Sequence, residues 1–190
     1  MVGLLEHVFT VEEWEEMGRV GVFDEDSRVE LIDGRVLDMN PVGDRHTSCV
    51  KRLNDMFAIA AHGIAIVSVQ DPIRLSDSSE PQPDLALLRY RDDFYRNAKP
   101  GPADTLLVVE VADTSLKQDR TKGIYYARAG IAQYWIVDLN GEKVIEFRDP
   151  PGHGGSSEAG YHSERAFTGE ERLAIGALPQ ITFTAAQILA

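Results

Sequence analysis

The stretch "TLLVVEVA" at positions 105–112 constrains the fold more than any other part of the chain. A strand that is apolar on both faces is typical of a sheet covered by helices on each side, as in α/β domains. Glu110 stands inside this stretch, and its charge is costly to bury unless a cation neutralises it. The stretch therefore predicts a central strand and a positive partner for Glu110.

A second carboxylate, Asp84, begins the apolar run in "PQPDLALL" at positions 81–88. Strands that follow each other along a chain are neighbours in the sheet about two-thirds of the time, so Asp84 and Glu110 are expected to face one pocket. Carboxylate oxygens suit Mg²⁺ or Mn²⁺ better than zinc. Such an ion can hold a phosphate and lower the pKa of a water molecule, so we predict a metal site and a phosphate-containing substrate.

The remaining segments predict an α/β domain with a central mixed sheet between two long helices. Apolar residues recur at helical spacing over 44–62 and 115–130, and Thr10 with Glu13 forms a capping-box pattern. Asp33-Gly34 and Asn140-Gly141 are turn pairs that predict β-hairpins at 28–39 and 132–148, extending the sheet. Further strands are expected at 64–70, 71–75, 83–89, 161–169 and 171–178, a mobile loop at 150–160 and a last helix after Thr184. We expect one domain over residues 1–190, because no repeat or internal boundary is visible.

Composition narrows the classes of protein. Cys49 is the single cysteine, which excludes an internal disulfide and a cysteine-rich zinc site, and we expect it to be buried. No apolar run approaches the roughly 20 residues of a membrane span, and the acidic N-terminal residues do not resemble a secretory signal, so a cytoplasmic protein is expected. The net charge of −12 weighs against broad attraction to nucleic acid, although a bound metal ion would offset the nearest carboxylates.

Six pieces, in one order, resemble the Uma-two family of restriction-endonuclease-like proteins. They are "VELIDGRV" at 29–36, His46, "PQPDLALL", "LLVVEVADTS" at 106–115, "DRTKGIYYARAGIAQYWIVD" at 119–138 and "FTAAQIL" at 183–189. The resemblance implies a restriction-endonuclease-like fold, the PD-(D/E)XK nuclease site and hydrolysis of a nucleic-acid phosphodiester, with DNA as the expected partner. It also implies that Asp84, Glu110 and the carbonyl of Val111 bind Mg²⁺ or Mn²⁺, and it adds Glu30 and His46 as further candidate site residues.

The sequence departs from the nuclease pattern at the catalytic lysine. In the simple motif a lysine stands two residues after the glutamate, where this chain has Ala112. Lys122 is the candidate replacement, because the helix that follows can return a long side chain toward the strand end. The family's spacing of Asp, Lys and Tyr matches Asp119, Lys122 and Tyr126.

Plainer interpretations exist for several of these residues. Glu30 alternates with apolar neighbours, which on pattern alone places it in solvent, and His46 at a helix start is typical of a capping or surface residue. The aromatic residues Tyr125, Tyr126, Tyr134 and Trp135 are expected in the core. Basic residues of the two long helices could gather beside the pocket or lie on separate solvated faces.

Two other functions fit the same residues. A binding or scaffold module could keep the fold without activity, given Ala112 and the acidic charge, and a small-molecule phosphodiesterase could use the same metal pocket. A homodimer would suit an enzyme that cuts both strands of a duplex. Because two carboxylates repel each other without a metal ion, Asp84→Asn is expected to stabilise the metal-free protein.

Overall fold

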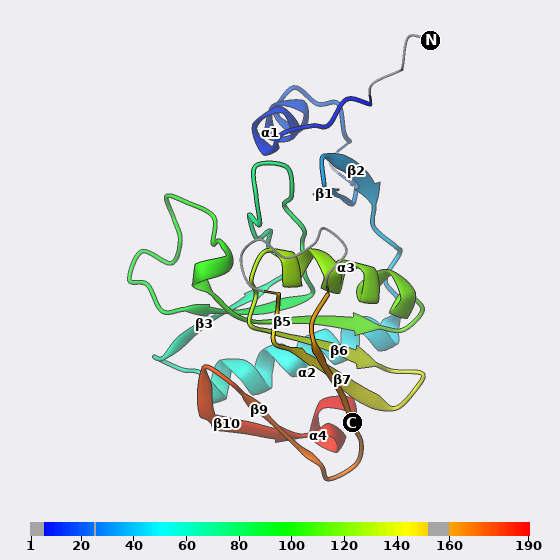
Figure 1. Ribbon diagram of the computed structural model, residues 1–190, viewed down its shortest axis with the longest axis vertical. Coiled ribbons are helices and arrows are strands. Elements are labelled where there is room, and N and C mark those ends of the chain that lie inside the picture. Colours follow the sequence, from blue (N-terminus) through cyan, green and yellow to red (C-terminus); the bar gives the residue numbers. More distant parts are fainter. Residues whose placement is uncertain (1–5, 25, 152–159) are drawn as a thin grey trace.

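The computed structural model describes residues 6–24, 26–151 and 160–190 (Figure 1). The helices are α1 (Val11–Arg19), α2 (Asp44–Ala60), α3 (Leu116–Arg128) and α4 (Ala185–Leu189), with a 3₁₀ turn η1 (Pro102–Asp104). The strands are β1 (Val29–Ile32), β2 (Arg35–Asp38), β3 (Ala65–Val69), β4 (Leu85–Arg89), β5 (Thr105–Ala112), β6 (Gln133–Asp138), β7 (Lys143–Arg148), β8 (Ser163–Phe167), β9 (Arg172–Ile175) and β10 (Leu178–Thr184).

A six-stranded mixed sheet forms the centre, in the order β3-β4-β5-β6-β7-β8. Its one parallel pair is β5 with β6, joined by the α3 crossover, and every other neighbouring pair is antiparallel. All eight residues of β5 are buried, as expected of a strand inside a sheet covered on both faces. Because β4 pairs with β5, the strand end that follows Asp84 lies beside the strand end that carries Glu110.

The two long helices cover opposite faces of this sheet, with α3 above it and α2 below it in Figure 1. On the α2 face, Leu53 and Phe57 of the helix pack with odd-numbered residues of β4 and β5 such as Leu85 and Val109. On the α3 face, Tyr126 packs with even-numbered strand residues such as Val108. The period-two alternation of a strand thus separates two cores, and it assigns Glu110 to the α3 face.

The hairpin at 28–39 forms, but it does not extend the central sheet as predicted. Asp33 and Gly34 have φ values of 46° and 70°, the left-handed conformation that a two-residue hairpin turn requires. The hairpin β1–β2 is a separate two-stranded sheet, bridged at Leu31 to Glu80 of the loop after β3. The Asp33-Gly34 turn therefore determines that the hairpin forms, whereas the position of the hairpin depends on its contact with the loop after β3.

The predicted strand at 71–75 is also wrong. Pro72 has no backbone N–H, and the amides of Ile73 and Leu75 donate to carbonyls of Pro81 and Ser79 within the same loop. Ile73 is nevertheless fully buried, which explains the strand-like apolar pattern. The segment is a loop that carries the chain out to the β1–β2 hairpin and back to Asp84.

The other predicted elements are confirmed with small changes. The β6–β7 hairpin belongs to the central sheet, but four residues connect its strands, and within this connection the amide of Gly141 donates to the Asp138 side chain. The prediction missed β10, which pairs with β9 as a separate sheet, while Thr184 caps α4 as expected. Cys49 is buried, and no helix within the described residues is long and apolar enough to cross a membrane. Most of the predicted mobile loop at 150–160 lies outside the described residues.

Candidate active site

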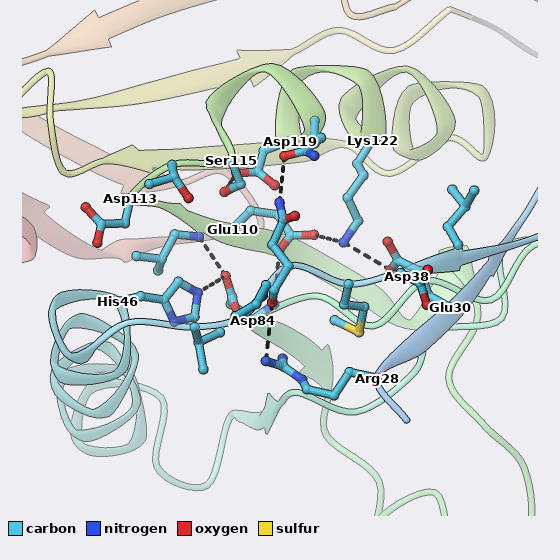
Figure 2. A pocket seen from close by; sticks show the side chains of 18 of the residues that line it. Arg28, Glu30, Asp38, His46, Asp84, Glu110, Asp113, Ser115, Asp119 and Lys122 are labelled. Carbon is cyan, nitrogen blue, oxygen red and sulfur yellow. Dashed lines mark hydrogen bonds and ion pairs between the residues drawn. The ribbon is translucent and has the colours of Figure 1, made fainter. Parts of the chain in front are cut away.

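Asp84 and Glu110 meet where β4 begins and β5 approaches its end, in the middle of the central sheet (Figure 2). The amide of Asp84 donates to Glu110 Oε2 at 3.3 Å, and the amide of Val111 donates to Asp84 Oδ2 at 2.8 Å. Both residues are buried, with 9% of Asp84 and 4% of Glu110 exposed, yet they line a cavity of about 660 Å³ that opens to solvent. The structure therefore brings together the two carboxylates that were predicted from distant positions in the chain.

Lys122 supplies the positive charge that the carboxylates need. Its Nζ lies 2.8 Å from Glu110 Oε1 and 3.1 Å from Glu30 Oε2, and its side chain is only 12% exposed. One turn further along α3, the hydroxyl of Tyr126 donates to Glu110 Oε1 at 3.0 Å. Two residues of one helix face therefore hold the same carboxylate oxygen, and Tyr126 belongs both to the core and to the site.

Glu30 is the residue for which the alternation argument was wrong. It is buried rather than solvent-facing, because the loop after β3 covers the hairpin and the amide of Gln82 donates to its Oε2 at 3.2 Å. The carboxylate thus reaches Lys122 from a separate two-stranded sheet. Period-two patterns predict which residues share a face but not which face a distant segment will cover.

His46 is not the surface or capping residue that its position at a helix start indicated. It is buried in the first turn of α2, and its Nε2 lies 2.9 Å from Asp84 Oδ2. Its Nδ1 is buried with no hydrogen-bond partner among the described residues. Figure 2 shows the imidazole beside Asp84. All five predicted side chains line one cavity: Glu30, His46, Asp84, Glu110 and Lys122.

The two carboxylates have opposite electrostatic surroundings. Burial raises the pKa of Asp84, but the hydrogen bond and charge of His46 and the amide of Val111 outweigh it and leave the pKa below its usual value. Burial raises the pKa of Glu110 to about 8, with Lys122 opposing the increase and Asp84 adding to it. Burial also lowers the pKa of Lys122, but Glu110 and Glu30 outweigh it and keep the pKa above the usual value. A cation bound between the carboxylates would favour the charged form of Glu110.

The residues fit a magnesium ion held largely by water and substrate. Within the described part of the chain no group of three or more His, Cys, Asp or Glu side chains could hold a metal ion, so the protein's side-chain ligands would be two. Among the residues that the structure describes, Asp84 Oδ1 has only a 3.5 Å contact from Gln70, and Glu110 Oε2 only the 3.3 Å contact from the Asp84 amide. Mg²⁺ is commonly bound by one or two carboxylates while keeping several waters, which matches these two weakly engaged oxygens.

Asp119 is a further buried carboxylate in the cavity, and it predicts a pH dependence of stability. Burial raises its pKa to about 6 from the ordinary 3.8, although Ser115 donates to it at 2.6 Å. From about pH 4 to pH 6 the unfolded chain loses this proton while the folded protein keeps it, so the free energy of unfolding falls as pH rises. Relative to wild type, Asp119→Asn is expected to gain on the order of 3 kcal/mol between pH 4 and pH 7.

Urea unfolding at several pH values would measure this difference. Asp55→Asn, on the exposed side of α2, is the matched control and should follow wild type throughout. Parallel stability curves for Asp119→Asn and wild type would contradict the assignment.

Several residues of the site were not found from the sequence. Arg28, Asn40 and Gln118 line the cavity, and Gln70 approaches Asp84 without lining it. None of the four stands in a motif, and only the tertiary structure brings them together. Tyr125 was expected in the core but is half-buried and lines the cavity. The basic residues of α2 and α3 do not form one patch, because the two helices cover opposite faces of the sheet.

Comparison with protein families gives a match over most of the chain. Residues 11–186 match the model of the Uma2 family, described as "Putative restriction endonuclease". The chain belongs to the Uma2 family. A search of curated proteins gives no significant match. Membership of this family supports a nuclease-like function.

A solved structure shows the same fold as this Uma2 protein. It is described as a "putative nuclease belonging to DUF820" from Anabaena variabilis, and it superposes with a TM-score of 0.72 at 12% sequence identity. The match covers 95% of this chain and 97% of the other. The predicted α/β, restriction-endonuclease-like fold is therefore confirmed, with a central mixed sheet, flanking helices and additional hairpins.

Proposed function

We propose that this Uma2 protein is a metal-dependent endonuclease that hydrolyses nucleic-acid phosphodiester bonds at the cavity lined by Asp84 and Glu110. One observation carries the proposal: Lys122 Nζ lies 2.8 Å from Glu110 although Ala112 occupies the motif's usual lysine position. A lysine from α3 thereby takes the place of the missing strand lysine. The alternative of an inactive scaffold loses one of its two supports, because Lys122 places an ammonium group beside Glu110, and it keeps the other, the net charge of −12.

The carboxylates of Asp84 and Glu110, with the carbonyl of Val111, would hold Mg²⁺ or Mn²⁺. The ion would supply a Lewis acid that polarises the phosphate and acidifies a water molecule. His46 and the amide of Val111 keep Asp84 ionised and oriented, and Tyr126 orients Glu110. Lys122, held between Glu110 and Glu30, would donate a hydrogen bond to the attacking water or to a phosphate oxygen.

In the reaction, the oxygen of water forms a bond to phosphorus and the ester bond to the leaving oxygen breaks. The leaving oxygen gains the proton that water loses, which yields an alcohol and a phosphomonoester. The burial of Lys122 and both carboxylates keeps bulk water from weakening their interactions with the developing charge.

Cleavage of supercoiled plasmid, single-stranded DNA and RNA should be compared with Mg²⁺, with Mn²⁺ and with a chelator. We expect cleavage of at least one nucleic acid with metal, none with chelator, and a loss of about 100-fold or more in Asp84→Asn. Hydrolysis of bis(p-nitrophenyl) phosphate without any nucleic-acid cleavage would instead favour a small-molecule phosphodiesterase. Activity that survives the chelator would contradict the metal-dependent mechanism.

A further inference from the structure

A short strap crosses the mouth of the cavity. The strap, residues 39–43, connects the β1–β2 hairpin to α2, and all five of its residues line the cavity. α3 lines the cavity as well, through residues that include Gln118 and Lys122. Asn40 Nδ2 donates to Gln118 Oε1 at 2.7 Å, which joins the strap to the helix. Both amides are exposed, whereas Asp84 and Glu110 beneath them are buried, so this bridge lies on the solvent side of the carboxylates.

The bridge limits the width of what can reach the carboxylates. Two amide side chains meet directly across the gap between strap and helix. A B-form duplex is wider than its major groove, which alone measures about 12 Å, whereas the strap and α3 are joined at this point by a hydrogen bond of 2.7 Å, so a duplex cannot pass between them. The cavity of about 660 Å³ falls in the range of pockets that enclose small ligands. A single strand with unstacked bases is narrow enough to enter.

The β1–β2 hairpin cannot move aside without disrupting the site. It carries Glu30, whose Oε2 lies 3.1 Å from Lys122 Nζ and accepts from the amide of Gln82. Withdrawing the hairpin would separate the buried ammonium from one of its two carboxylate partners. The hairpin to which the strap is joined therefore carries a residue of the proposed catalytic arrangement.

The charge of the lining limits the number of phosphates. Six carboxylates line the cavity, against two strong cations. The carboxylates are Glu30, Asp38, Asp84, Glu110, Asp113 and Asp119, and the cations are Arg28 and Lys122. One divalent ion would leave the lining negative, and each further phosphate of a long polyanion requires a lysine or arginine to neutralise it.

Arg28 is the cation placed to receive such a phosphate. It is exposed at the mouth, and within residues 6–24, 26–151 and 160–190 its guanidinium makes no ion pair, only a 3.5 Å contact with the carbonyl of Asn40. Lys122, in contrast, is held between two carboxylates. Arg28 can thus bind a phosphate next to the one at the metal site.

We infer that the substrate is a single-stranded stretch of a few nucleotides rather than a duplex, with Arg28 contacting a neighbouring phosphate. This inference rests on the proposed function, because it names the form of nucleic acid that the same cavity takes. It also predicts a shallow salt dependence, since one or two phosphate contacts give a slope of about −0.7 each in a plot of log affinity against log salt.

Binding can be measured apart from turnover. Fluorescence anisotropy would compare a fluorescein-labelled single-stranded hexanucleotide with a 20-base-pair duplex, in Ca²⁺ in place of Mg²⁺. We expect the single strand to bind at least about tenfold more tightly, and Arg28→Ala to weaken its binding about tenfold through loss of a charge-assisted hydrogen bond. Arg172→Ala is the matched control, because Arg172 is also exposed but lies on β9, outside the cavity.

The results test the single-strand preference and the endonuclease function separately. Equal or tighter binding of the duplex, absence of single-strand binding, or equal losses in Arg28→Ala and Arg172→Ala would overturn the inference. Plasmid duplex cut as fast as a single strand would support the endonuclease and overturn the single-strand preference. Selective single-strand binding without metal-dependent cleavage would have the opposite meaning: the preference would stand and the hydrolytic function would fail.

Discussion

Lys122→Met is expected to lose about 3–5 kcal/mol of unfolding free energy at pH 8, the cost of leaving buried carboxylates without their cation. Lys122 Nζ is within 3.1 Å of both Glu30 and Glu110, whose side chains are 9% and 5% exposed. Methionine fills a similar volume without charge, so the loss reports the ion pairs rather than a cavity. Because burial raises the pKa of Glu110, this carboxylate can protonate once its cation is gone, and the deficit relative to wild type should shrink as the pH falls to 5.

Two further variants separate this effect from a general disturbance of α3. Lys117→Met lies on the exposed side of the same helix and should remain within about 0.5 kcal/mol of wild type. Adding Glu30→Gln to Lys122→Met removes one of the two unpaired charges and should recover part of the lost stability. Thermal or urea unfolding of the four proteins measures these differences. A Lys122→Met protein as stable as wild type at pH 8 would show that the ion pairs contribute nothing.

Glu110→Gln is expected to abolish metal-dependent cleavage, by about 100-fold or more, without lowering stability in a chelator. The loss of activity follows from removing one of the two side-chain metal ligands, a change worth several kcal/mol in the transition state. Stability should be kept because glutamine can still accept the hydrogen bond from Tyr126, and Lys122 keeps Glu30. Cleavage assays and unfolding curves on the same preparations measure both quantities.

The pH dependence of this variant has a defined sign. Burial raises the pKa of Glu110 to about 8 from the ordinary 4.5, so the wild-type protein loses stability as the pH rises through that interval, and glutamine at this position removes the loss. The advantage of Glu110→Gln over wild type should therefore grow from pH 5 to pH 9 in a chelator. A variant that keeps full activity, or unfolds more easily than wild type at pH 9, would contradict the role assigned to Glu110.

The structure changes which carboxylate is expected to give a stabilising substitution in the metal-free protein, from Asp84 to Glu110. Repulsion between the two predicted that Asp84→Asn would stabilise the metal-free protein. His46 and the amide of Val111 instead leave the pKa of Asp84 below its usual value, so the charged form is favoured in the folded state. Glu110 is the residue whose charge is disfavoured by burial, and the stabilising substitution is accordingly expected there.

The sequence by itself determined the local elements and the pair of metal-binding candidates. A run that is apolar on both faces predicted the buried strand β5. Turn pairs predicted the hairpins. The carboxylates Asp84 and Glu110, carried by two sequential strand segments, were predicted to meet because such strands are usually neighbours. These features depend on period, turn conformation and chain order, all of which are local in sequence.

Only the tertiary structure decided which side chains complete the site. Glu30 faces Lys122 because the loop after β3 buries the β1–β2 hairpin, and His46 faces Asp84 because α2 crosses that end of the sheet. Asn40 and Gln118, 78 positions apart, meet over the cavity for the same kind of reason. Such contacts arise from the burial and docking of whole segments, and a short-range pattern carries no information about which distant surface will cover a residue.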